Sequence, residues 1–101
     1  MYSNFLLGQL KVSTATKIKL KRTPLDLIAR HAVGDHGLAT QRELKRNQLA
    51  LQTADQIVSR YYVDPANPTR GQVVVTTNEH WDTTTVKLDY EQEHEGETWS
   101  T

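Results

Sequence analysis

The hydrophobic period of this sequence changes near residue 55, and this change constrains the fold more than any other feature. Residues 24–33 and 41–53 carry apolar side chains at helical spacing, whereas residues 56–63 and 83–90 follow a period of two and residues 72–77 hold three valines at their centre. A period of 3.6 residues is typical of a helix, and a period of two of a half-buried strand. Consecutive strands with short links favour an antiparallel meander, whose apolar face needs a cover. We therefore predict an α+β fold, with an antiparallel sheet of three to four strands and two helices packed on one face.

The first predicted helix, residues 24–33, has clear start and stop signals. Thr23 is a good N-cap, Pro24 suits the first helical position, and Gly34 can end the helix. Apolar side chains recur at i, i+3, i+4 and i+7, and we expect this stripe to face the sheet. The stripe consists of Leu25, Ile28, Ala29 and Ala32.

The second predicted helix, residues 41–53, begins with a capping box. The Thr40 hydroxyl can accept from the amide of Glu43, and the Glu43 carboxylate can accept from the amide of Thr40. We expect Thr40→Ala to cost about 0.5–2 kcal/mol and Glu43→Ala to cost less. One helix face holds Leu44, Asn47, Leu51 and Ala54. Asn47 therefore points to the core edge and needs hydrogen-bond partners.

The other segments complete the sheet. Residues 5–14 predict a strand, and residues 14–21 fit either a strand or a short helical turn. Residues 64–71 form a loop, because two prolines and a glycine interrupt the alternation, and residues 78–81 turn the chain. One face of the strand over residues 56–63 holds Ile57, Ser59, Tyr61 and Val63. The predicted inward side chains of the strand over residues 83–90 are Thr84, Val86, Leu88 and Tyr90.

Composition and charge narrow the function classes. The 101 residues include no cysteine, which excludes disulfides and thiolate metal sites and suits a reducing cytoplasm. No apolar run approaches the roughly 18 residues of a membrane helix, and the first residues do not resemble a signal peptide. Residues 1–60 hold ten Lys and Arg against four Asp and Glu, and residues 61–101 hold two against eight. We expect a cytoplasmic protein with one domain over residues 1–90 and an acidic, frayed tail over residues 91–101.

The stretch from Arg30 to Gly37, which we call the corner, connects the two predicted helices and is rich in polar and charged side chains. Its side chains His31, Asp35 and His36 could bind a metal together with His80, but the histidines lack the i, i+4 spacing of a helical zinc site. The corner therefore predicts a polar turn in place of a metal centre, with His31 near the negative end of the first helix.

A nuclease site is a second interpretation of these residues. Asp35 with Glu43 and Lys45 resembles the acid and the Glu-x-Lys motif of restriction-type nucleases. Those residues normally lie on adjacent strands, whereas Glu43 belongs here to a helix cap. We predict no catalytic residue.

Trp81 is the other notable side chain, because it lies in a predicted turn. A tryptophan there is either an anchor over the core edge or a binding hot spot. We expect Trp81 to lie near Arg30, Asp35 and His36 on the surface, with Arg30 paired to Asp35 or to Asp82.

Short motifs are scattered over roughly residues 6–90. They are Leu7-Gly8-Gln9, Thr23-Pro24, Ala29-Arg30-His31-Ala32, Gly34-Asp35, Gly37, Asn47, Ala50-Leu51, Ser59, Tyr61, Val73-Val74-Val75-Thr76-Thr77-Asn78-Glu79, Asp82 and Thr84-Thr85-Val86. This series resembles a family of small proteins of bacterial plasmids, phages and integrated elements, often labelled as restriction-system subunits. The chain departs from the family pattern at His36, where the family has Trp, and at Trp81-Asp82-Thr83, where it has Asp-Arg-Ser. The resemblance implies a mobile-element origin and no activity.

Together these observations favour a small non-enzymatic protein-binding module that inhibits or modulates a host defence or DNA-processing system. We expect a protein partner, no membrane, no cofactor and no metal; a homo-oligomer stays open. The predicted partner-binding residues are Arg30, His31, Asp35, His36, Trp81 and Thr84.

The alternative is a nucleic-acid-binding regulator that uses the basic N-terminal half. Its predicted contacts are Lys17, Lys19, Lys21, Arg22, Arg42, Lys45 and Arg46. A helix-turn-helix reader fits less well, because the link between the two predicted helices exceeds the usual 3–4 residues.

Overall fold

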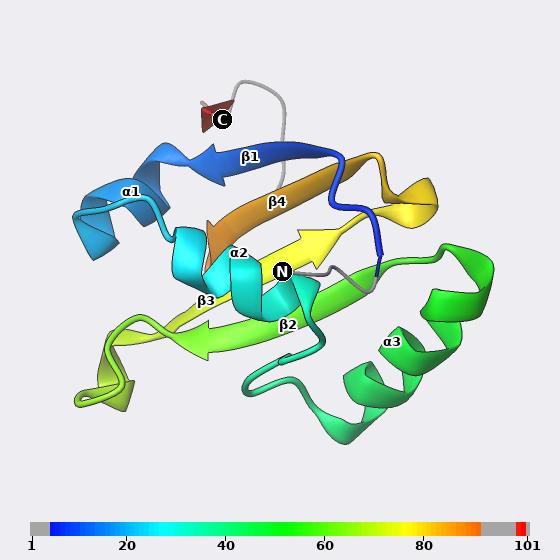
Figure 1. The fold of residues 1–101 in the computed structure, drawn as a ribbon. Coiled ribbons are helices and arrows are strands. Elements are labelled where there is room, and N and C mark those ends of the chain that lie inside the picture. Colours follow the sequence, from blue (N-terminus) through cyan, green and yellow to red (C-terminus); the bar gives the residue numbers. More distant parts are fainter. Residues whose placement is uncertain (1–4, 92–98, 101) are drawn as a thin grey trace.

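The computed structural model describes residues 5–91 and 99–100, and the α+β class is confirmed (Figure 1). The sheet has the order β2-β3-β4-β1-β5. Its strands are β1 (Gln9–Ser13), β2 (Ile57–Tyr62), β3 (Gln72–Thr77), β4 (Thr83–Leu88) and β5 (Trp99–Ser100). The helices are α1 (Thr14–Leu20), α2 (Leu25–Ala32) and α3 (Gln41–Thr53), with short 3-10 turns at η1 (Pro68–Arg70) and η2 (Glu79–Trp81).

Strands β2, β3 and β4 form the predicted antiparallel meander. The first strand departs from the prediction of a wholly antiparallel sheet, because β1 pairs with β4 in parallel, with Leu10 opposite Thr84. The helices and strands β2 and β3 lie between β1 and β4 in the sequence, so the chain can return in the same direction. Strand β5 pairs with the other edge of β1.

The ambiguous segment after β1 is a helix, which gives three helices where two were predicted. Ser13 starts α1, since its hydroxyl accepts from the Thr16 amide over 3.1 Å. Lys21 ends the helix in the left-handed conformation. Ala15 and Leu20 of α1 pack on the same apolar core as Leu27 of α2, so both helices cover one face of the sheet.

Helix α2 begins one residue later than predicted. Pro24 occupies the N-cap position with a non-helical backbone and no side-chain cap bond, so the predicted Thr23 cap is wrong. Leu25 is 62% exposed, whereas Leu27, Ile28 and the two residues at the end of the helix are buried. The apolar stripe is therefore rotated from the predicted one.

Helix α3 has the predicted bounds and the predicted capping box. It lies along the edge of β2, while α2 lies over the sheet (Figure 1). Asn47 and Ala50 are buried against this edge, whereas Leu44 and Leu51 are partly exposed. The predicted face was wrong for the two leucines because the helix covers an edge and not a broad apolar surface.

The period of two is confirmed in β2 and β4, whereas the three valines at the centre of β3 are all buried. Val73, Val75, Val86 and Leu88 form the core with β2 side chains and α2. Tyr90, predicted to point inward, is exposed because β4 ends at Leu88. The predicted frayed tail lies mostly outside the described residues. Within them, no helix is long and apolar enough to cross a membrane.

Candidate partner-binding site

The corner between α2 and α3 is built on the Arg30–Asp35 ion pair, one of the two pairings that the sequence predicts. Arg30 Nε donates to Asp35 Oδ2 over 2.7 Å, and Arg30 Nη2 donates to Asp35 Oδ1 over 3.4 Å. The amide of Gly37 also donates to Asp35 Oδ1, over 3.2 Å. The Arg30 bond, with help from Gly37, lowers the pKa of the Asp35 carboxyl. The alternative pairing with Asp82 is wrong, because Asp82 bonds to Asn78 in the η2 turn.

Tyr61 of β2 fixes the corner from below. Its hydroxyl donates to the backbone carbonyl of Asp35 over 2.5 Å. The Arg30 guanidinium lies 4.6 Å from the centroid of the Tyr61 ring, which is a cation–π distance. Burial raises the pKa of Tyr61 to about 12, so the phenol stays protonated and remains a donor. Both partners of the exposed ion pair are thus tied to a strand of the sheet.

The backbone of β2 holds the same loop. The Arg60 carbonyl accepts from the Leu38 amide over 2.7 Å, and the Arg60 amide donates to the His36 carbonyl over 3.1 Å. Gly37, between them, has φ +58°, and a Cβ there would lie 2.2 Å from the Arg60 carbonyl oxygen. Only glycine permits this approach, so the loop pairs with β2 almost as a further strand.

A chain of buried polar side chains runs beneath the corner. His31 Nδ1 lies 2.6 Å from Ser59 Oγ, and His31 Nε2 lies 2.8 Å from Thr77 Oγ1. Thr77 Oγ1 lies 2.7 Å from Thr84 Oγ1, whose hydroxyl donates to the Leu7 carbonyl over 2.7 Å. All four of these side chains are fully buried. Because each has its partners, the network favours a single arrangement of the elements above it.

The Leu7 carbonyl determines which group donates in each hydrogen bond of this network, because a carbonyl only accepts and each hydroxyl has one hydrogen to donate. Thr84 donates to Leu7, so Thr77 donates to Thr84, and the Nε2–H of His31 donates to Thr77. Burial lowers the pKa of His31 to about 3. The ring is therefore neutral, and its Nδ1 accepts from Ser59.

His36 is the outer end of the network. Its Nδ1 lies 2.7 Å from Ser59 Oγ, and since the hydroxyl hydrogen of Ser59 serves His31, His36 Nδ1–H is the donor. Burial lowers the pKa of His36, which favours the neutral ring with Nε2 as an acceptor. With Phe5 and Leu44, His36 lines a groove of about 260 Å³ between the corner and α3.

Two predicted contact residues, His31 and Thr84, cannot touch a partner, because both are fully buried. Their place in the network explains why they are polar. His31 lies in the last turn of α2, as expected, but Ser59 and Thr77 hold its ring inside the domain.

Among the described residues, no hydrogen bond or ring contact joins Trp81 to Arg30, Asp35 or His36. Its indole N–H donates to the carbonyl of Asp55 over 2.9 Å, and its ring centroid lies 5.8 Å from that of Phe5. The Phe5 centroid also lies 5.1 Å from that of His31, so Phe5 lies between Trp81 and the corner. Trp81 is thus an anchor over the core edge, the first of its two interpretations.

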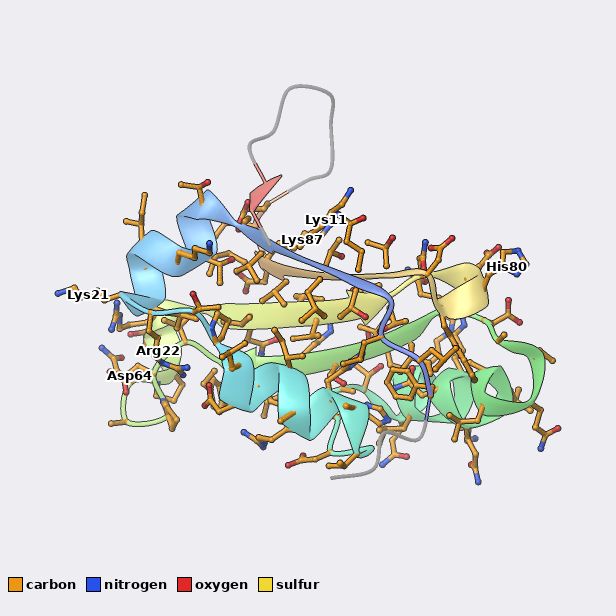
Figure 2. All side chains as sticks on the ribbon, turned by 45° about the horizontal axis from the view of Figure 1, so that its top comes forward. Lys11, Lys21, Arg22, Asp64, His80 and Lys87 are labelled. Atoms are coloured by element: carbon orange, nitrogen blue, oxygen red, sulfur yellow. The ribbon has the colours of Figure 1, made fainter. Side chains whose placement is uncertain are left out.

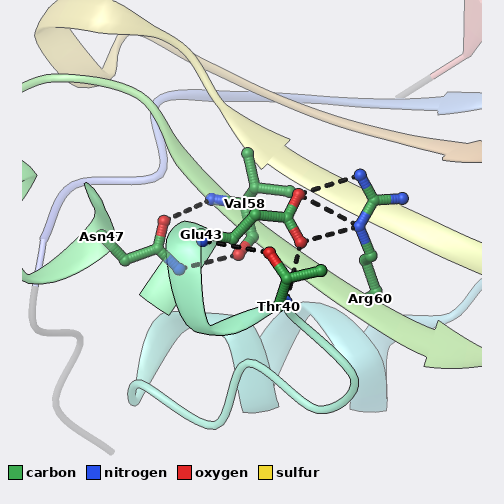
Figure 3. Close-up of polar contacts among 5 residues, drawn as sticks. All are labelled: Thr40, Glu43, Asn47, Val58 and Arg60. Atoms are coloured by element: carbon green, nitrogen blue, oxygen red, sulfur yellow. Dashed lines mark hydrogen bonds and ion pairs between the residues drawn. The ribbon is translucent and has the colours of Figure 1, made fainter. Parts of the chain in front are cut away.

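A polar cluster joins α3 to the edge of β2 (Figure 3). Asn47 accepts from the Val58 amide over 2.9 Å and donates to the Val58 carbonyl over 2.8 Å. Thr40 and Glu43 form the capping box. The Glu43 carboxylate also accepts hydrogen bonds from Nε and Nη2 of Arg60, each over 2.9 Å. This pairing with Arg60 is the main cause that lowers the pKa of Glu43. The edge of β2 is therefore closed at Val58.

A cleft of about 470 Å³ adjoins the corner on the other side of α2. Exposed Arg22 and Arg30, with Asp26 and Asp35, form the rim of this cleft, and buried Leu27 and Val63 form its floor, next to Tyr61 and Pro65. Arg60 also borders the cleft, but its side chain lies with Glu43 on the other face of β2. Sequence reasoning did not find Arg60 and Tyr61; the only signal was that the alternation places them on opposite faces of one strand.

The basic residues predicted to bind nucleic acid fall into two groups. Lys17 and Lys19 lie on α1 and are followed by Lys21 and Arg22, at the β1 and β4 side of the sheet. The second group consists of Arg42, Lys45 and Arg46, all exposed on α3 along the opposite edge, at β2. The two groups therefore do not form one continuous patch.

Within residues 5–91 and 99–100, no group of His, Asp or Glu side chains is arranged to hold a metal ion. Comparison of the chain with family models, curated proteins and solved structures finds no match. The assignment of a function therefore depends on the geometry of the corner and the cleft.

Proposed function

We propose that this chain is a small protein-binding module whose binding surface is the corner together with the cleft. The observation that carries the proposal is that an exposed ion pair, Arg30–Asp35, is held in place from below. Tyr61 bonds to the backbone of Asp35 and lies under Arg30. A surface that is already ordered loses little conformational freedom on binding, so more of the contact energy appears as affinity.

The composition of this surface supports the same proposal. Arginine and tyrosine are enriched among the residues that dominate protein–protein binding, and the cleft presents Arg22, Arg30 and Tyr61. Arg30 and Asp35 side chains are both about half exposed, with exposed fractions of 47% and 48%. His36, with its unused Nε2, extends the surface toward α3.

A non-enzymatic role is part of the proposal. Ser59, flanked by His31 and His36, is the arrangement nearest to a nucleophile with a base, but its hydroxyl is fully buried and no substrate can reach it. The resemblance of the corner motif to proteins of plasmids and phages supports a cytoplasmic partner from a host defence or DNA-processing system.

Nucleic-acid binding is the second candidate, and one observation favours it. Arg42, Lys45 and Arg46 are exposed on α3 and have no ion-pair partner among the described residues. Three unpaired cations on one helix can contact phosphates without sequence preference.

Capture of partners by the tagged full chain from a bacterial lysate, with and without nuclease, separates the two candidates. We expect a protein partner in stoichiometric amount that survives nuclease treatment. Loss of every captured component after nuclease would contradict the protein-binding proposal and favour the second candidate.

A further inference from the structure

The chemistry of the cleft also indicates what kind of partner it accepts. We infer that the cleft binds an acidic peptide segment of the partner protein, with an apolar side chain on the floor and carboxylates on the arginine rim. This inference rests on the proposed function and specifies its ligand.

The rim has a large surplus of hydrogen-bond donors. Each guanidinium has five N–H groups. Arg22 and Arg30 each direct two nitrogens to one carboxylate, of Asp26 and Asp35, which leaves most of their N–H groups unused. Their side chains are 46% and 47% exposed. The existing pairs hold the guanidinium groups in position, so further carboxylates would meet fixed donors with charge-assisted bonds.

The floor of the cleft favours a peptide over a nucleic acid. Leu27 and Val63 are buried, and the exposed Pro65 also lines the cleft. Such a floor suits an apolar or aromatic side chain, whereas a phosphate backbone would leave it unfilled.

The charge around the cleft supports an acidic ligand. Lys21 directly precedes Arg22, and Figure 2 shows both at the end of the molecule that also holds Asp64, far from His80. Arg70 lies at this end as well, since its guanidinium donates to the Lys19 carbonyl over 3.4 Å. This cationic end continues the arginine rim and would draw an acidic segment toward the cleft.

Fluorescence anisotropy with a defined probe tests the inference on the full chain. The probe is a short fluorescein-labelled peptide of Asp and Glu around one central Trp; the comparison probes replace Trp by Ala or are a labelled oligothymidylate. We expect the Trp peptide to bind wild type and to bind Arg22→Ala and Arg30→Ala about tenfold more weakly, which is the loss of one charge-assisted bond. Arg42→Ala, which removes an unpaired cation from α3, is the matched control and should bind as wild type does.

Two sets of results would overturn the inference. One is equal peptide affinity of Arg22→Ala, Arg30→Ala and Arg42→Ala, or equal affinity for the Trp and Ala peptides. The other is oligothymidylate binding that the two cleft variants lose. If an alanine variant does not fold, Arg22→Lys or Arg30→Lys keeps the charge but loses the planar fork and should still weaken the Trp peptide.

Failure of the inference and failure of the proposed function give different results. A nuclease-resistant protein partner with no acidic-peptide binding would refute only the inference. Peptide binding at the cleft without any nuclease-resistant partner would count against the proposed function.

Discussion

The buried network predicts that acid destabilises this domain at a pH well above the titration of its carboxylates. His31 has an ordinary pKa of 6.5, and burial lowers it to about 3 in the folded chain. The unfolded chain therefore binds a proton on His31 more readily than the folded chain does. Stability is complete above pH 6.5 and falls as the pH falls below that value.

The magnitude follows from the same two values. A pH of 5.0 lies 1.5 units below the ordinary pKa of 6.5, which His31 has in the unfolded chain. Each unit is worth about 1.4 kcal/mol, so the free energy of unfolding falls by about 2 kcal/mol. Any folded-state pKa well below 5 gives the same loss, because His31 then stays neutral in the fold. His36 acts in the same direction, since burial lowers its pKa too.

Urea denaturation at pH 7.5, 6.5, 5.5 and 5.0 measures this loss. The lowered pKa values of Asp35 and Glu43 place their titration below the ordinary 3.8 and 4.5, so carboxylates contribute little in this range. His31→Gln should be less stable at pH 7.5 but show a smaller decrease toward pH 5.0, whereas His80→Gln, at an exposed histidine, should follow wild type. Equal stability of wild type at pH 7.5 and 5.0 would refute the buried, neutral His31.

Three further predictions concern the joins around β2, each read from the midpoint of urea unfolding. Thr40→Ala should cost about 0.5–2 kcal/mol. Glu43→Ala should cost more, because it also leaves half-buried Arg60 without its carboxylate. A larger loss of stability in Thr40→Ala than in Glu43→Ala would contradict the structure. Asn47→Leu should cost about 2 kcal/mol or more, because it leaves the amide and carbonyl at this edge unpaired; an unchanged midpoint would mean that the edge is not closed there. Gly37→Ala should cost more than about 1 kcal/mol through strain and the clash with Arg60, and a stabilised variant would show that the corner is not bound to β2.

Features that depend on neighbouring residues could be predicted from the sequence. The capping box of α3 needs only Thr40 and Glu43, three residues apart, and its prediction is confirmed. The Arg30–Asp35 pair is also local, because a helix end turns the chain back within five residues. Glu43→Ala, which the sequence ranks as less destabilising than Thr40→Ala, becomes the more destabilising change in the structure. The reason is that Arg60, 17 residues away, also binds the Glu43 carboxylate, and no local pattern indicates this pair.

Features that depend on distant partners could not be predicted. Helix α2 buries the face that carries His31, whose ring bonds to Ser59 and Thr77. These partners lie 28 and 46 residues away in the sequence. The parallel pairing of β1 with β4 joins residues that lie still farther apart, such as Leu10 and Thr84. Ser59, on one strand face with Ile57 and Tyr61, and Thr84, at a predicted inward position, were the available hint that the core holds a polar network.

Capture by three baits from one nuclease-treated lysate tests the central claim most directly. The baits are wild type, Asp35→Ala and Glu79→Ala, where Glu79 is an exposed carboxylate in the η2 turn that serves as the matched control. Thermal melting should differ little among them, since an exposed ion pair contributes at most about 1 kcal/mol. We predict that Asp35→Ala captures the partner about tenfold less than wild type and that Glu79→Ala captures it equally. Equal capture by all three folded baits would contradict the claim that the corner is the binding surface.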